Sequence, residues 1–142
     1  MTTFKEIPVH LEGEPAALAT GNLLPLLHEV RHALAQLLDD DTYQHTIDLQ
    51  AMPLSPDEDQ ALQALLGVGE VSAHLNALGL SNIEETQFSG VWRVTHHNAA
   101  QTVTGRYLEI TRIPMILQAQ SADMAAGLAT LTALLEQTSV VL

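Results

Sequence analysis

Residues 91–110, with the sequence VWRVTHHNAAQTVTGRYLEI, predict a β-hairpin that decides the fold class. The segments 91–96 and 103–110 are rich in β-branched and aromatic side chains, which are typical of strands. The polar segment 97–101 between them has the composition of a hairpin loop. Because Pro114 has no backbone N–H to donate, we expect strand pairing to stop before it.

The segments that precede this hairpin extend the same sheet. Residues 83–88 predict one strand and residues 70–75 another, in which Val71, Ala73 and Leu75 alternate with polar side chains. A further short strand is expected at residues 45–49. Because short turns join most of these strands, we expect an antiparallel sheet of about four to five strands.

Three helices are predicted around the sheet, over residues 22–38, 55–66 and 121–137. The first has a leucine-rich stripe with three- and four-residue steps, and Asn22 is its expected N-cap. Ser55 and Glu58 form a capping box at the start of the second. The third has an apolar stripe formed by Met124, Leu128, Leu131 and Leu135. We therefore expect an α+β fold, with helices packed on one face of the sheet and the other face partly open to a partner.

Composition excludes several classes of protein. The 142 residues include 17 acidic and 5 basic side chains, for a net charge of −12, so the chain lacks the basic surface of a nucleic-acid-binding protein. No apolar run reaches the ~18 residues of a membrane span, and no secretory signal is visible, so we expect a cytoplasmic protein. The chain has no cysteine, which excludes disulfides and thiolate metal sites within it.

The sequence His28-Glu29-Val30-Arg31-His32 matches the HExxH pattern of zinc peptidases. At ~100° per residue, however, both histidines point away from the leucine stripe and toward solvent, whereas a catalytic zinc needs an enclosed cleft. No third ligand stands in a recognisable motif. We therefore expect no catalytic residue, no cofactor and no enzyme, with His28 and His32 as the candidates if a metal binds at all.

Trp92 and Arg93 allow two interpretations. Tryptophan and arginine dominate the energetics of many protein interfaces, but both side chains also occur as parts of a sheet. In the first case, Arg93 is a surface side chain whose removal changes stability by no more than ~0.5 kcal/mol.

Three stretches together resemble the HupH/HyaF family of hydrogenase expression/formation proteins. Their sequences are LGVGEVSA at 66–73, ETQFSGVWRV at 85–94 and EITRIP at 109–114. The resemblance covers roughly residues 21–137 and implies a single HupH/HyaF-like domain over residues 21–142. Residues 1–20, which Pro8, Gly13 and Pro15 interrupt, predict an extended arm before it.

The resemblance implies an accessory protein that acts as an assembly chaperone for a NiFe uptake hydrogenase and binds a hydrogenase subunit precursor. It also places the candidate partner-binding residues, Glu70, Trp92, Arg93 and Pro114, in the strand-and-turn region. Family members often carry two related modules, which leaves open whether this chain acts alone, as a homo-oligomer or with other maturation proteins. The alternative function is a small metal-handling protein or metal-dependent hydrolase that uses His28 and His32.

Overall fold

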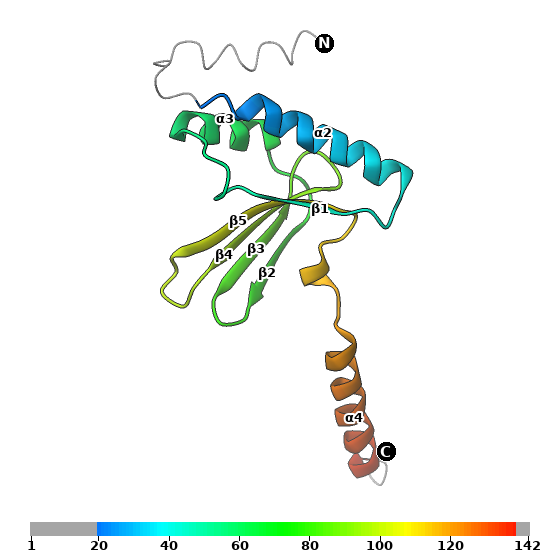
Figure 1. The fold of residues 1–142 in the computed structure, drawn as a ribbon. Coiled ribbons are helices and arrows are strands. Elements are labelled where there is room, and N and C mark those ends of the chain that lie inside the picture. The colour runs from blue at the N-terminus through cyan, green and yellow to red at the C-terminus, as the bar shows by residue number, and fades with distance from the viewer. Residues whose placement is uncertain (1–19, 139–142) are drawn as a thin grey trace. The chain divides into compact units, whose positions relative to one another are not determined.

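The computed structural model describes residues 20–138, which form two compact units, one ending at Arg112 and the other beginning at Ile113. The first unit holds two helices and a five-stranded sheet, and the second holds a short 3-10 helix and a long α-helix (Figure 1). Of the predicted arm at residues 1–20, all but Thr20 lies outside the described residues.

The sheet has five antiparallel strands in the order β1-β5-β4-β3-β2, which confirms the predicted α+β class. The strands are β1 (His45–Asp48), β2 (Ser72–Asn76), β3 (Leu80–Glu85), β4 (Val91–His97) and β5 (Val103–Ile110). The hairpin of β4 and β5 lies at the centre of the sheet, with Val91 opposite Ile110. Its second strand has the predicted bounds.

The strand predicted at residues 83–88 lies three residues too far along the chain, because residues 86–90 form a tight turn. Thr86 stabilises this turn, since its hydroxyl donates to the carbonyl oxygen of Val91 at 2.9 Å. The backbone N–H of Val91 donates in turn to the carbonyl oxygen of Phe88. Gly90 adopts a φ of 92°, a value that L side chains rarely adopt, so the turn requires glycine there.

Helix α2 (Leu23–Asp39) buries the predicted apolar stripe, in which the buried residues are Leu23, Leu26, Val30, Ala33 and Leu37. Asn22 is the N-cap residue of this helix, as predicted, but its side chain makes no capping hydrogen bond. The side-chain amide donates instead to the carbonyl oxygen of Pro53 at 2.8 Å. Asn22 therefore ties the start of α2 to the segment that precedes the next helix.

Helix α3 (Pro56–Leu66) begins with the predicted capping box and ends at Gly67. The carboxylate of Glu58 accepts from the backbone N–H of Ser55 at 2.8 Å, and from both Thr20 and the N–H of Gly21. The side chain is buried, and burial alone would raise its pKa. The hydrogen bonds from Ser55, Thr20 and Gly21 outweigh burial and lower the pKa from 4.5 to about 2.

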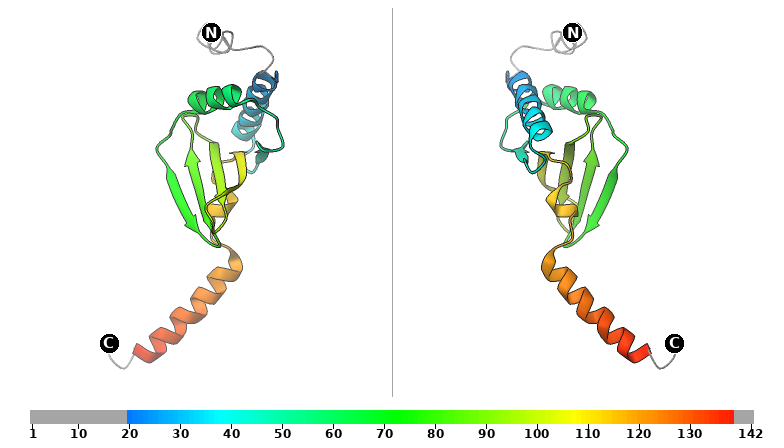
Figure 2. Two further views of the ribbon diagram at one scale, coloured as in Figure 1. Left: turned by 90° about the vertical axis from the view of Figure 1, so that its left-hand side faces the viewer. Right: turned by 90° about the vertical axis from the view of Figure 1, so that its right-hand side faces the viewer.

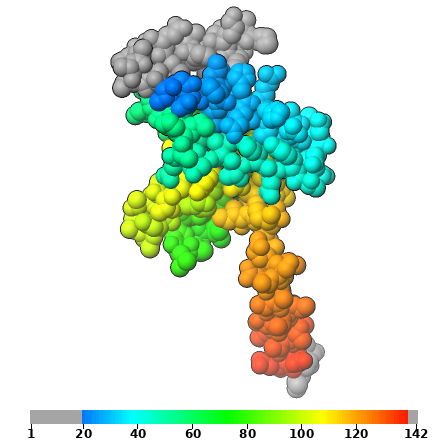
Figure 3. Space-filling view, viewed as in Figure 1, coloured from blue at the N-terminus to red at the C-terminus, as the bar shows by residue number. Residues whose placement is uncertain are grey.

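The main core lies where α2 and α3 cover one end of the sheet, against Ile47, Val91, Leu108 and Ile110 (Figures 1 and 2). The turns of the β2–β3 and β4–β5 hairpins extend away from these helices. Figure 3 shows the surface of this unit, with α2 and the segment after it, in blue to cyan, running across it.

The opposite face of the sheet is less open than we expected from the sequence. Ile83 and Val94 are opposite each other in the register and, like the adjacent Trp92, are buried. The central part of that face is therefore closed to a partner.

The second unit contains η2 (Met115–Leu117) and α4 (Ser121–Thr138). Pro114 is the N-cap residue of η2. No residue of α4 is buried, although the predicted apolar stripe is present. Among residues 20–138, no helix is both long and apolar enough to cross a membrane.

The network around Glu58 makes the stability of the first unit dependent on pH. The pKa of Glu58 is lower in the folded state than in the unfolded chain. The ionised carboxylate therefore contributes its full stabilisation above about pH 4.5, and this stabilisation is lost as the pH falls toward about 2. We expect Glu58→Gln to lower the free energy of unfolding by ~2–3 kcal/mol at pH 7. Urea unfolding at pH 7 and near pH 2 would measure this.

The matched control is Glu70→Gln, which removes an exposed carboxylate and should change stability by less than ~0.5 kcal/mol. The difference between the wild type and Glu58→Gln should shrink near pH 2. An equal difference at both pH values would contradict the assigned role of the carboxylate.

Candidate functional site

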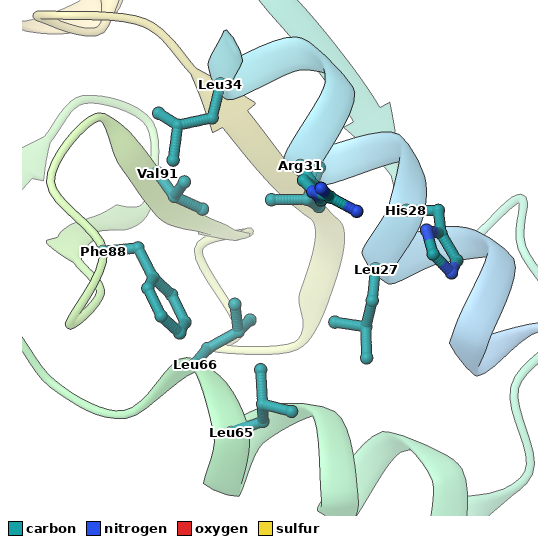
Figure 4. A pocket seen from close by; sticks show the side chains of 9 residues that line it. Leu27, His28, Arg31, Leu34, Leu65, Leu66, Phe88 and Val91 are labelled. Carbon is teal, nitrogen blue, oxygen red and sulfur yellow. The ribbon is translucent and has the colours of Figure 1, made fainter. Parts of the chain in front are cut away.

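An apolar cavity of about 240 Å³ opens between α2, α3 and the turn at residues 86–90. We call it the α2 groove. Figure 4 shows side chains from these three segments facing a common space. The groove is lined by Leu27, His28, Val30, Arg31, Leu34, Leu65, Leu66, Phe88 and Val91. It is nonpolar and open on one side, so it suits an apolar side chain of a partner.

A backbone hydrogen bond ties the 86–90 turn to α3, and the turn packs closely against leucine side chains of α2. The N–H of Gln87 donates to the carbonyl oxygen of Leu66, at the end of α3, at 2.8 Å. A Cβ at Gly90 would lie 3.2 Å from methyl carbons of both Leu34 and Leu37 on α2. Any larger residue at Gly90 would therefore press on the leucines of α2 as well as strain the turn.

A wider and more polar hollow of about 620 Å³ lies beside the groove and shares Arg31 and Leu34 with it. Its wall continues along α2 through Leu37 and Leu38, and across the turn through Ser89 and Gly90. Glu85 and Arg112 complete the lining.

Arg31 and Arg112 are both exposed, and neither makes a hydrogen bond or ion pair within residues 20–138. The other two arginines of this part of the chain are paired, Arg93 with Glu84 and Arg106 with Asp59. In a chain of net charge −12, two unpaired guanidinium groups at one hollow form a local site for a carboxylate.

The structure puts the four residues that the resemblance placed in a partner-binding region into different surroundings. Trp92 is 5% exposed, and its indole N–H donates to the carbonyl oxygen of Thr111 at 3.0 Å. Its neighbour Arg93 lies on the opposite face of the sheet, since adjacent strand residues alternate. Glu70 is exposed just before β2, and Pro114 belongs to the second unit.

Arg93 is partly buried, which does not match the surface side chain that the first of the two interpretations assumed. Only 16% of its side chain is exposed, and its guanidinium donates to the carbonyl oxygen of Gly67 at 3.1 Å, at the end of α3. It also lies 3.5 Å from a carboxylate oxygen of Glu84. Arg93 thus joins β4 to the end of α3, which is a structural role whether or not it contacts a partner.

The HExxH segment lies on α2, with His28 and His32 exposed as we expected. Glu29 does not stand between them as a free base, because its carboxylate lies 2.7 Å from Nε2 of His45. Within residues 20–138, no group of three His, Asp or Glu side chains is arranged to hold a metal ion. Metal binding by the two histidines stays a prediction.

A family model matches this chain over the residues that the structure describes. The family model for the HupH hydrogenase expression protein, C-terminal conserved region, matches residues 20–138. This chain belongs to that family. The solved structure of the hydrogenase expression protein HupH from Thiobacillus denitrificans ATCC 25259 is 41% identical, with a TM-score of 0.78, and the match covers 83% of this chain and 98% of that one.

Two curated relatives of this HupH-family chain are longer proteins. It is 30% identical over 117 residues to the hydrogenase expression/formation protein HupH of Rhizobium leguminosarum bv. viciae, covering 82% of this chain and 41% of that protein. It is 32% identical over 106 residues to the hydrogenase-1 operon protein HyaF of Escherichia coli K12, covering 72% of this chain and 35% of that protein. The chain thus spans about two fifths or less of the length of these relatives.

The α2 groove draws on the same stretches that carried the family resemblance. Leu66 comes from the first stretch, and Phe88 and Val91 come from the second. The position of Arg31 at both the groove and the hollow could not be inferred from the sequence, in which Arg31 is the fourth residue of the HExxH match. The signal that the sequence does offer is that basic side chains are scarce, because the whole chain has only five of them.

Replacing Arg31 or Arg93 by an uncharged residue should change the free energy of unfolding by different amounts. We expect Arg93→Met to lower the free energy of unfolding by ~1–2 kcal/mol, because it removes the bonds to Gly67 and Glu84. The same change at Arg31 should cost less than ~0.5 kcal/mol. Urea unfolding of both variants measures this difference. Equal losses of stability would contradict the finding that Arg93 is bonded within the structure and Arg31 is not.

Proposed function

We propose that this HupH-family chain is an assembly chaperone for a NiFe uptake hydrogenase, acting in the cytoplasm, and that it binds a hydrogenase subunit precursor at the α2 groove. The observation that carries the proposal is the apolar cavity beside Arg31 and Arg112, two exposed arginines without a partner in the described part of the chain. The names of the relatives, as hydrogenase expression/formation proteins, support the choice of a hydrogenase as the partner.

The chemistry of the groove defines the kind of segment that it fits. A leucine or phenylalanine side chain that fills the cavity would gain ~1.5–3 kcal/mol from burial. A carboxylate beside that side chain would reach the guanidinium groups of the adjacent hollow and form charge-assisted hydrogen bonds. The preferred ligand is therefore a precursor segment that combines large apolar side chains with an acidic residue.

A binding role fits this surface better than a catalytic one. Most of the groove lining is hydrocarbon, which packs against a ligand but supplies no reactive group. The guanidinium groups of the two arginines attract a carboxylate through charge and paired hydrogen bonds, which is a binding role. We accordingly propose that the chain shields or shapes the precursor and is not an enzyme.

Co-purification with separately expressed large- and small-subunit precursors tests this proposal. We expect Arg31→Glu to reduce capture of one precursor at least tenfold, while the melting temperature changes little because Arg31 makes no bond in the described structure. A second variant, Phe88→Ser, should weaken capture by removing one wall of the cavity.

The control is the double variant Ser72→Glu/Asn76→Glu, whose sites are exposed on β2 and whose change in net charge equals that of Arg31→Glu. It should leave capture unchanged. If both groove variants capture the precursors as well as the wild type does, the α2 groove is not the binding site. Failure of the wild type to capture either precursor would contradict the proposed function itself.

A further inference from the structure

The hollow beside the α2 groove is lined by residues with hydrogen-bond donors that the fold does not use. The guanidinium groups of Arg31 and Arg112 have no partner in the described part of the chain. The backbone N–H groups of Ser89 and Gly90, in the turn that lines the same hollow, donate to no other described residue. Free donors thus come to one hollow from α2, from the turn and from the end of β5.

The turn is attached to both segments that supply these arginines. The backbone N–H of Thr111 donates to the carbonyl oxygen of Gly90 at 2.9 Å, so Arg112 directly follows a residue that is bonded to the turn. On α2, methyl carbons of Leu34 and Leu37 lie against the same glycine, since a Cβ there would be 3.2 Å from each. The lining is therefore held in place by the fold, which lowers the cost of ordering it around a ligand.

The charge of the hollow suits a single carboxylate. Glu85 belongs to the same lining and makes no ion pair within residues 20–138. Two guanidinium groups and this carboxylate leave one net positive charge, in a chain whose overall net charge is −12. A phosphate or a pair of acidic side chains would bring a second negative charge close to Glu85, and like charges repel. The hollow therefore favours a ligand with one negative charge.

The α2 groove and the hollow share Arg31 and Leu34, so an apolar side chain and a carboxylate can be bound next to each other. The carboxylate comes either from an acidic side chain or from a chain end. In the first case, the apolar side chain belongs to a different residue, and the backbone leaves the site in two directions. In a C-terminal residue, the side chain and the carboxylate branch from the same Cα, and the backbone leaves in one direction.

Two features of the site favour the chain end. The α2 groove has walls formed by α2, α3 and the turn at residues 86–90, so it accommodates a chain that ends there more easily than one that passes through (Figure 4). Backbone N–H groups are a recurring means of capturing C-terminal carboxylates, and guanidinium groups add paired, charge-assisted hydrogen bonds. Both kinds of donor are present at the hollow.

We propose that the α2 groove and the hollow together bind the free C-terminus of a partner chain. The last side chain, which is large and apolar, enters the groove, and the α-carboxylate is bound by Arg31, Arg112 and the N–H groups of Ser89 and Gly90. This inference rests on the proposed function and deepens it, because it names the part of the precursor that the chain holds.

Titration of the isotope-labelled full chain with synthetic octapeptides, followed by NMR, tests whether the site recognises a chain end. The first peptide consists of glycine and serine and ends in phenylalanine with a free carboxylate. We expect it to shift the backbone amide resonances of Ser89 and Gly90, and to bind at least tenfold more tightly than the same peptide with a C-terminal amide. A third peptide, amidated and with an internal Phe-Asp pair, should bind as weakly as the amide.

Three results of this titration would overturn the proposal. The first is equal binding of the free acid and the amide. The second is binding of the Phe-Asp peptide as tight as that of the free acid, which would assign the hollow to an acidic side chain. The third is the absence of binding by every peptide at ~1–5 mM, a concentration at which even a weak site is occupied.

Arg112→Gln separates recognition of the carboxylate from a structural role. It should weaken binding of the free acid at least tenfold and leave binding of the amide unchanged, because only the acid carries a charge for Arg112 to bind. The matched control is Ser72→Glu, which changes the net charge by the same amount at an exposed site on β2 and should bind both peptides as the wild type does. An equal effect of Arg112→Gln on both peptides, or no effect on the acid, would contradict the proposal.

A precursor that the wild type captures is also compared with the same precursor carrying eight glycine and serine residues after its last residue. The extension should reduce capture at least tenfold. Equal capture of both forms would overturn this inference and leave the proposed function standing, because the precursor would then be held elsewhere along its chain. Failure to capture either unmodified precursor would contradict the proposed function instead, and the peptide titration would still decide whether the site recognises a chain end.

Discussion

The buried carboxylate of Glu58 sets the arrangement on which the first unit depends. It belongs to the first turn of α3, and it accepts hydrogen bonds from Ser55 before that helix and from Thr20 and Gly21 before α2. The starts of two helices more than thirty residues apart are thereby joined at one side chain. Each of these two helices supplies one wall of the α2 groove.

Local patterns were sufficient for most of the secondary structure. The capping box at Ser55, the C-terminal glycine at position 67 and the alternating strand at 103–110 are short-range signals, and the structure confirms them. The predictions differ from the structure where contacts between residues distant in the sequence determine the local structure. Asn22 is the N-cap residue of α2, but its side chain bonds to Pro53 and not to the first turn of the helix. The turn at residues 86–90 depends on bonds between Thr86 and Val91.

The candidate site was less accessible to sequence reasoning than the fold. Trp92 and Arg93 are adjacent in the chain, but a strand sends them to opposite faces, where one packs in a core and the other bonds to Gly67. The groove instead gathers Leu34, Leu66 and Phe88 from three separate segments. No periodicity in the sequence places these together, because their proximity is a property of how α2, α3 and the β3–β4 turn pack.

The burial of Trp92 also gives the chain an optical reporter of its own. It is the only tryptophan, and its indole is enclosed in the first unit with its N–H bonded to Thr111. Helix α4 contains no aromatic residue. Tryptophan emission therefore follows the sheet and its helices without contribution from α4, whereas far-ultraviolet dichroism follows both. Comparing the two signals during denaturation separates the melting of α4 from that of the sheet, with no label attached.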